Sequence, residues 1–162
     1  MKERSEFVFD ARRIRDAGGH KAALAPDPAL FADAFASPGA LKKLEVELAF
    51  SVADEELLLD GKVTAELALE CSRCAAPLTR SFSDSFDEQY GYSVEYIDTR
   101  ELIREAAALL EPMKVLCSEA CKGRCPECGA DLNKKTCSCD RGRAPHFDAL
   151  KDFKVRKNDK GS

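Results

Sequence analysis

Residues 44–52 read LEVELAFSV, and this strict alternation of apolar and polar side chains is typical of a β-strand with one buried face. Residues 63–70, VTAELALE, repeat the alternation. Between the two runs stands Asp60-Gly61, a dipeptide that favours a tight hairpin turn. We therefore expect two antiparallel neighbours joined at Asp60-Gly61, with one face packed on a core and the other in water.

Further elements extend outward from this pair. Short strands are expected at residues 6–10 and 78–90, whereas residues 11–25 read as irregular. Asp27-Pro28 is a typical helix start. A second helix should begin at Asp98, stop before Pro112 and pack an apolar stripe on the sheet, formed by Leu102, Ile103, Ala106, Leu109 and Leu110. The sequence thus predicts an α+β fold, an antiparallel β-sheet with flanking helices.

Charge and composition divide the chain of 162 residues into two parts. Residues 1–111 carry 13 basic and 22 acidic residues, a net charge of -9, whereas residues 112–162 carry 12 basic and 7 acidic residues, a net charge of +5. After Pro112 the composition changes to Cys, Lys, Gly and Arg. We therefore predict an α+β domain over residues 1–111 and a cysteine-rich basic region over residues 112–162, whose charge suits an anionic partner.

The sequence also bears on the cellular compartment. The N-terminal residues lack the apolar run of a signal peptide, and no stretch approaches the ~18 apolar residues of a membrane span. We expect a cytoplasmic protein with no membrane association. Thiols stay reduced in the cytoplasm, so the eight cysteines favour metal ligation over disulfides.

The eight cysteines form four close pairs, which are Cys71 with Cys74, Cys117 with Cys121, Cys125 with Cys128, and Cys137 with Cys139. Two such pairs complete the tetrahedron of a structural zinc site. The preferred site, a zinc knuckle, is Cys125, Cys128, Cys137 and Cys139. Gly129 supports it, because glycine permits the positive φ that the turn after the second ligand often needs. Cys117 and Cys121 lie close enough in the sequence to replace two of these ligands.

Cys71 and Cys74 admit three interpretations. Cys71 is in phase with the buried face of its strand, so the pair could belong to the core. The pair could also join Cys117 and Cys121 in a second metal site. A redox pair is the third interpretation, which the absence of a following helix disfavours. The cysteine spacings match neither ferredoxin run, and this favours zinc over an iron–sulfur cluster.

The remaining motifs favour a binding protein over an enzyme with a small-molecule substrate. There is no glycine-rich phosphate loop and no nucleophile elbow, and an all-cysteine zinc site is structural rather than catalytic. Basic residues interleave with the cysteines and suit phosphate contacts to folded RNA, while scarce aromatic residues argue against base-by-base recognition. The candidate RNA-binding residues are Lys122, Arg124, Lys134, Lys135, Arg141 and Arg143.

These residues together resemble the YceD family. The resemblance rests on Cys71-Ser72-Arg73-Cys74 at a strand end, on Pro112-Met113-Lys114, and on the cysteine string from Cys117 to Cys139. It extends to residues 145–150, PHFDAL, which resemble the closing helix of that family. The sequence itself predicts a last short helix over residues 147–153. The resemblance spans residues 44–153. Arg124 departs from the family, which usually has an aliphatic residue there.

The resemblance implies a bacterial or plastid factor needed for the accumulation of large-subunit ribosomal RNA, without known enzymatic activity. The gene of such a factor often lies beside that of a zinc-ribbon ribosomal protein. Some family members keep the C-x-R-C motif and lack the C-terminal cysteines. Cys71 and Cys74 therefore need not share a metal with the others.

One hypothesis and two alternatives follow from the sequence. We expect a factor in large-subunit ribosome biogenesis that binds ribosomal RNA, a pre-ribosomal particle or a large-subunit ribosomal protein through a zinc-stabilised basic region. The first alternative is a thiol-based redox sensor or chaperone with a releasable zinc. The second is a protein-binding module whose acidic sheet contacts a basic ribosomal protein.

Overall fold

The structure is a computed structural model that describes residues 6–37, 39–54 and 56–139. Contacts divide the chain into two compact units, residues 1–121 and residues 122–162. Composition predicts a boundary after residue 111, whereas the first unit includes residues 112–121, because Cys117 and Cys121 pack at the end of a strand of the sheet. The two units are described separately.

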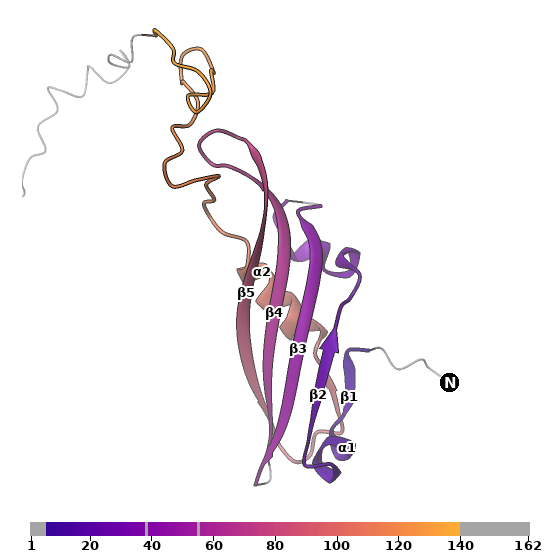
Figure 1. The fold of residues 1–162 in the computed structure, drawn as a ribbon. Coiled ribbons are helices and arrows are strands. Elements are labelled where there is room, and N and C mark those ends of the chain that lie inside the picture. Colours follow the sequence, from indigo (N-terminus) through magenta and orange to yellow (C-terminus); the bar gives the residue numbers. More distant parts are fainter. Residues whose placement is uncertain (1–5, 38, 55, 140–162) are drawn as a thin grey trace, which may run out of the picture. The chain divides into compact units, whose positions relative to one another are not determined.

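The first unit is built on a four-stranded antiparallel sheet (Figure 1). Its strand order is β2-β3-β4-β5. The bounds are β2 Gly19–Leu24, β3 Leu41–Ala53, β4 Glu56–Glu70 and β5 Pro77–Tyr90. A smaller sheet pairs β1, Val8–Asp10, with β6, Tyr96–Asp98, also antiparallel. The predicted antiparallel α+β fold is confirmed in the described residues.

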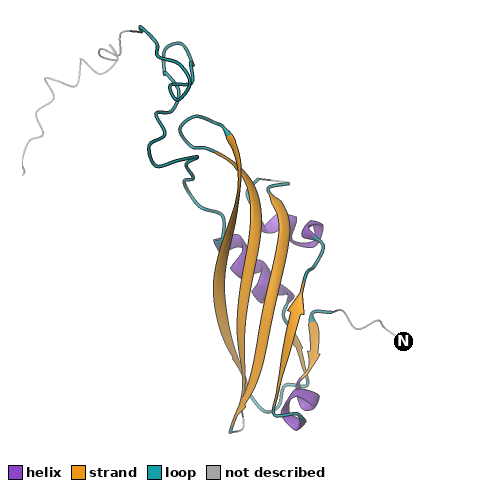
Figure 2. Ribbon diagram, in the orientation of Figure 1, coloured by secondary structure: helices purple, strands orange, loops and turns teal. Residues whose placement is uncertain are grey.

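One face of the sheet forms the core. The alternation predicted for residues 44–52 is present from Leu44 to Phe50, since Leu44, Val46, Leu48 and Phe50 are buried while the residues between them are more exposed. Val52, expected on the same face, is exposed. Figure 2 shows the helices gathered on the far side of the sheet. They are α1 Ala11–Asp16, the 3-10 helix η1 Pro28–Ala34 and α2 Arg100–Leu109. Phe31 of η1 and Ile103 of α2 are fully buried in the same core.

The predicted turn at Asp60-Gly61 is wrong. Both residues lie inside β4, opposite Ala49 and Leu48 of β3, and the chain reverses instead near Asp54, which adopts a φ of 52°. Gly61 has a packing role, because a Cβ atom at that position would meet the Phe86 ring at 2.2 Å. A glycine inside a strand can mark such a close approach, and here a ring from β5 occupies the space.

Three smaller expectations also change. Residues 11–25 are not irregular, since they hold α1 and β2. The stripe on α2 buries Ile103, Ala106 and Leu110 as expected, but Leu109 is 77% exposed. The helix starting at Pro28 forms as a 3-10 helix, with the Asp27 carboxylate accepting from the Ala29 N–H at 2.9 Å.

The helix predicted at residues 147–153 lies outside the described residues. Within them, no helix is both long and apolar enough to cross a membrane.

The described part of the second unit, residues 122–139, contains no helix and no named strand. One isolated antiparallel bridge joins Arg124 to Asp131, and the Leu132 N–H donates to the Gly123 carbonyl at 2.9 Å. Only Gly123 and Cys125 are buried in this stretch. The segment is therefore a small set of turns without an apolar core of its own.

Candidate metal centres

The structure brings the eight cysteines together as two groups of four. We name Cys71, Cys74, Cys117 and Cys121 the strand-end cluster, and Cys125, Cys128, Cys137 and Cys139 the C-terminal cluster. Within each cluster the four Sγ atoms lie within 4.8 Å of one another. The first lies within the unit of residues 1–121 and the second within the unit of residues 122–162. Cys117 and Cys121, considered above as replacements in the C-terminal site, sit instead with Cys71 and Cys74.

The strand-end cluster forms where the chain leaves β4. Cys71 is the first residue after that strand, and the segment from Cys71 to Ala76 turns the chain into β5. The Sγ atoms of Cys71 and Cys121 are 3.7 Å apart, as are those of Cys74 and Cys117. These distances are far longer than the ~2.05 Å of a disulfide. They match the edge of about 3.8 Å of an ideal tetrahedron with ~2.3 Å Zn–S bonds.

The C-terminal cluster uses the same local turn. In the strand-end cluster the Ala75 N–H donates to the Cys71 carbonyl at 2.8 Å, and the Cys71 N–H to the Ala76 carbonyl at 2.9 Å. In the C-terminal cluster the Gly129 N–H donates to the Cys125 carbonyl, and the Cys125 N–H to the Ala130 carbonyl, both at 2.9 Å. Two C-x-x-C segments far apart in the sequence therefore present their thiols from equivalent turns.

Both turns place the residue after the second cysteine in the left-handed region. That residue is Gly129 in the C-terminal cluster, with a φ of 70°, as its glycine identity suggests. In the strand-end cluster it is Ala75, with a φ of 55°. A non-glycine residue there carries strain of about 1–3 kcal/mol, which surrounding contacts must offset. The spacing of Cys71 and Cys74 is visible in the sequence, but the left-handed conformation of Ala75 is not, because an alanine has no preference for it.

In the strand-end cluster, backbone hydrogen bonds lower the pKa values of the thiols, whereas burial, and at Cys74 the neighbouring thiols, raise them. The backbone N–H of Cys117 donates to the Cys71 sulfur and lowers the pKa of that thiol to about 6. The Ala76 N–H lowers the pKa of Cys74, but burial and the neighbouring thiols outweigh it and raise that pKa to about 12. The Cys71 thiol therefore loses its proton readily, whereas ionisation of all four thiols together is unfavourable.

The C-terminal thiols show the same division. Backbone N–H groups of Cys128 and Glu127 lower the pKa of Cys125, whereas the Cys128 thiol raises the pKa of Cys139 to about 12. Four thiols this close cannot all ionise unless a cation offsets their mutual repulsion. A divalent ion at the centre removes that repulsion and deprotonates its thiol ligands. Each donor set thus fits a single tetrahedral, thiophilic ion such as zinc.

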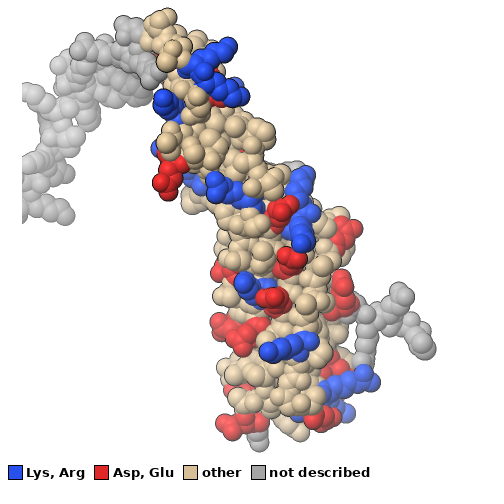
Figure 3. All heavy atoms as spheres, viewed as in Figure 1, with Lys and Arg blue, Asp and Glu red and all other residues tan. Residues whose placement is uncertain are grey.

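Four of the six candidate RNA-binding residues lie in the described part of the chain. Lys122, Arg124, Lys134 and Lys135 are exposed, and Figure 3 shows Lys and Arg side chains on the surface of their unit. Glu127 and Asp131 are the acidic residues of the same stretch. The Asp131 carboxylate accepts the Asn133 N–H at 3.0 Å, which lowers the pKa of Asp131. Arg141 and Arg143 lie outside the described residues.

The outer face of the sheet carries charges of both signs. Glu47 of β3 lies opposite Lys62 of β4, and Lys43 lies opposite Glu66. Figure 3 shows acidic and basic side chains interspersed over this unit rather than gathered by sign. The net charge of -9 in residues 1–111 is therefore not concentrated on this face as a single acidic patch.

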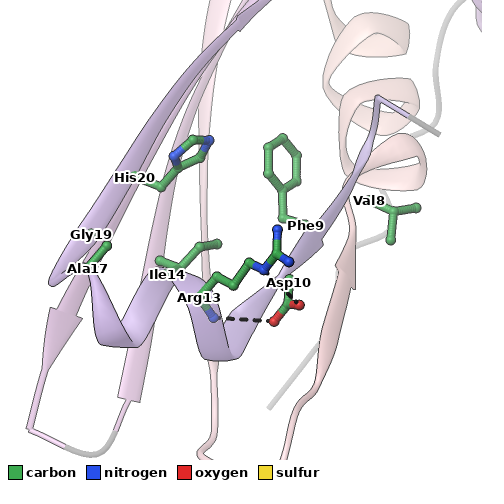
Figure 4. Close-up of a pocket in the computed structure, with 8 residues that line it drawn as sticks. All are labelled: Val8, Phe9, Asp10, Arg13, Ile14, Ala17, Gly19 and His20. Carbon is green, nitrogen blue, oxygen red and sulfur yellow. Dashed lines mark hydrogen bonds and ion pairs between the residues drawn. The ribbon is translucent and has the colours of Figure 1, made fainter. Parts of the chain in front are cut away.

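A pocket near the N-terminus has a structural explanation. Figure 4 shows it between β1, α1 and the start of β2, with Phe9, Ile14 and His20 among its lining residues. Its carboxylate, on Asp10, accepts the Arg13 N–H at 3.2 Å and so caps α1. The lining of this pocket holds no cysteine and no serine. The two cysteine clusters are the stronger candidates for a functional site.

Together, the fold and these clusters define an antiparallel α+β protein with a C-terminal segment organised by cysteines. Residues 92–154 match the family model described as large ribosomal RNA subunit accumulation protein YceD. This match confirms the resemblance to the YceD family that was inferred from the motifs.

One of the curated relatives carries the name of the same family. The chain is 44% identical over 48 residues to the large ribosomal RNA subunit accumulation protein YCED homolog 1, chloroplastic, of Arabidopsis thaliana, which covers 30% of this chain and 15% of that protein. It is 29% identical over 106 residues to uncharacterized proteins of Mycobacterium tuberculosis and Mycobacterium bovis, covering 55% of this chain and 51% of each. The chain therefore spans about half the length of the mycobacterial relatives and 15% of the chloroplast protein. No solved structure matches the chain.

Proposed function

We propose that this protein supports the accumulation or processing of large-subunit ribosomal RNA by binding, without catalysing a reaction. In this proposal zinc at the C-terminal cluster shapes residues 122–139, and the basic side chains around it contact ribosomal RNA or a ribosomal protein in a pre-ribosomal particle. A cytoplasmic location is part of the proposal.

The family match over residues 92–154 carries this proposal. That stretch includes all four cysteines of the C-terminal cluster and the interleaved basic residues. The printed description of the family and the name of the chloroplast relative both refer to accumulation of large-subunit ribosomal RNA. The matched stretch thus includes most of the basic region of residues 112–162.

The charges around the C-terminal cluster support contact with phosphate. Residues 122–139 hold four basic side chains against Glu127 and Asp131. Four thiolates around one zinc ion carry two negative charges, so phosphate must be met by side chains that extend away from the metal. All four basic residues are exposed, as this requires. Contacts to phosphate release counterions and make binding dependent on salt.

The test uses two matched pairs of neighbouring lysines. Lys134→Gln with Lys135→Gln removes two charges beside the C-terminal cluster, and Lys42→Gln with Lys43→Gln removes two charges from the sheet. All four side chains are exposed, and each pair includes one surface ion pair, Lys134 with Asp131 at 3.8 Å and Lys43 with Glu45 at 2.7 Å. The control therefore matches the test pair in charge, exposure and local interaction.

Binding is measured on the full chain with a transcript of large-subunit ribosomal RNA over a range of salt concentrations. If both lysines contact phosphate, the slope of log K against log salt should fall by roughly two for the Lys134/Lys135 variant. The Lys42/Lys43 variant should keep the wild-type slope. Equal slopes in all three proteins would exclude phosphate contacts by this lysine pair.

The cellular test asks whether binding matters for ribosome assembly. In a host lacking the native protein, we expect wild-type and Lys42/Lys43 chains to restore the ratio of large- to small-subunit ribosomal RNA, and the Lys134/Lys135 variant to restore it less. Sedimentation of the tagged protein with large-subunit precursors, lost after nuclease, should accompany restoration. A normal ratio with the lysine variant and with a Cys125→Ser chain that has lost zinc would refute the proposal.

A further inference from the structure

The strand-end cluster lies apart from the main core and holds a segment without regular structure. Cys71, Cys74 and Cys121 form their own buried group, with Ala76, Leu78 and Leu116 partly buried against it. Residues 111–121, which contain two of the cysteines, form neither helix nor strand. So small an apolar group gives little reason for such a segment to dock on the sheet, and the contacts that do hold it need an explanation.

All four residues of the Cys71–Cys74 turn contact this segment. The Ser72 N–H donates to the Val115 carbonyl at 2.8 Å, and the Val115 N–H donates back to the Ser72 Oγ at 3.1 Å. The Arg73 guanidinium donates to the Cys121 carbonyl at 2.9 Å. The two thiols flanking these residues lie 3.7 Å from the thiols of Cys121 and Cys117. Each of the four residues of the turn therefore contacts a residue of this segment.

The arrangement places one thiol pair across from the other, as a tetrahedral ion requires. Three of the four thiols are buried, with Cys71 3%, Cys74 2% and Cys121 3% exposed, which shields a bound ion from water. Sulfur atoms within 4.8 Å of one another surround one ion and leave no room for a multinuclear iron–sulfur cluster. Ala75 has the same left-handed φ as Gly129 in the equivalent turn. The strained backbone at Ala75 therefore orients the two thiols of its turn as the Gly129 turn does.

We propose that the strand-end cluster is a second zinc site, which binds zinc independently of the C-terminal cluster and clasps residues 115–121 to the end of β4. The protein then carries two zinc ions per chain. Arg73 is a positioning residue of this site, because it fixes the carbonyl of the ligand Cys121 and places a positive charge near a centre with a net charge of -2. The clasped segment ends at Cys121, four residues before Cys125 in the sequence.

The test is zinc stoichiometry in purified full-length protein. Wild type should hold two zinc ions per chain by elemental analysis. A Cys125→Ser, Cys128→Ser chain should hold one, and a Cys71→Ser, Cys74→Ser chain should also hold one. The first variant is decisive, because it leaves the strand-end cluster untouched and does not depend on the sheet tolerating new residues. One zinc in wild type and none in this folded variant would overturn the proposal.

Cobalt identifies the ligands of the remaining site. The Cys125→Ser, Cys128→Ser chain, stripped of zinc and titrated with Co²⁺, should bind one ion with the intense visible bands of tetrahedral cobalt and a strong thiolate-to-cobalt charge-transfer band. Weak bands typical of octahedral cobalt would also overturn the proposal. Neither measurement depends on RNA, so two zinc ions with normal ribosomal RNA in the lysine variant would leave this proposal standing while the proposed function fails.

Discussion

Chelation of zinc should unfold residues 122–139 while the sheet stays folded. In this stretch no aliphatic or aromatic side chain is buried, and Leu132, its largest apolar residue, is only partly covered. Partial burial of one leucine stabilises by about 1 kcal/mol. Zinc bound by a small cysteine domain contributes about 10–16 kcal/mol near neutral pH. The metal therefore exceeds the apolar contribution roughly tenfold, and its loss should remove the fold of this stretch.

The sheet has a different source of stability. Leu57, Val63, Ala65 and Leu67 of β4 are fully buried and contact a core shared with η1 and α2. This packing involves no metal ligand. We therefore expect the amides of β3 and β4 to keep their protection when zinc leaves both clusters.

Hydrogen–deuterium exchange read by mass spectrometry separates the two outcomes. The reporters are the hydrogen-bonded amides of Cys125, Gly129 and Leu132, with donor–acceptor distances of 2.9 Å. After chelation their protection should fall to near that of an unfolded peptide, and excess zinc should restore it. Persistent protection in protein shown to be free of zinc would refute the reasoning, as would simultaneous loss of protection in β4.

Three further predictions follow from the packing and exposure of particular residues. Gly61→Ala should destabilise the protein by about 1–3 kcal/mol in denaturant unfolding, because the new Cβ atom overlaps the Phe86 ring; the cost should disappear in a Phe86→Ala background, and an equal cost in both would contradict the contact. Arg73→Ala should keep two zinc ions per chain but release one of them to a competing chelator faster than wild type, and unchanged kinetics would argue against its positioning role. Mild peroxide should oxidise the C-terminal cluster before the strand-end cluster, because one rather than three of its four thiols is buried; peptide mapping of oxidised cysteines checks the order, and the reverse order would show that burial does not govern it.

Local patterns in the sequence were sufficient for several features. The alternation in residues 44–52 and 63–70 predicted two strands and their buried faces, because side-chain direction in a strand depends only on position. Cys125, Cys128 and Gly129 predicted a turn that presents two thiols, because ligands two residues apart need only a local backbone conformation. The helix starting near Asp98 was also evident from its period, although the exposure of Leu109 was not.

Other features were decided by residues distant in the sequence. Asp60-Gly61 has the local preference of a turn, yet pairing with β3 and β5 keeps it in a strand. The Phe86 ring occupies the space that a side chain at Gly61 would fill. The grouping of Cys71 and Cys74 with Cys117 and Cys121 depends on a sheet and a helix that return the chain over more than 40 residues. By itself, the sequence determined the alternating faces of two strands, the resemblance to the YceD family and the presence of thiol pairs, because each depends on short-range patterns. Only the tertiary structure decided which pairs meet, because that depends on where the packed core brings the chain back.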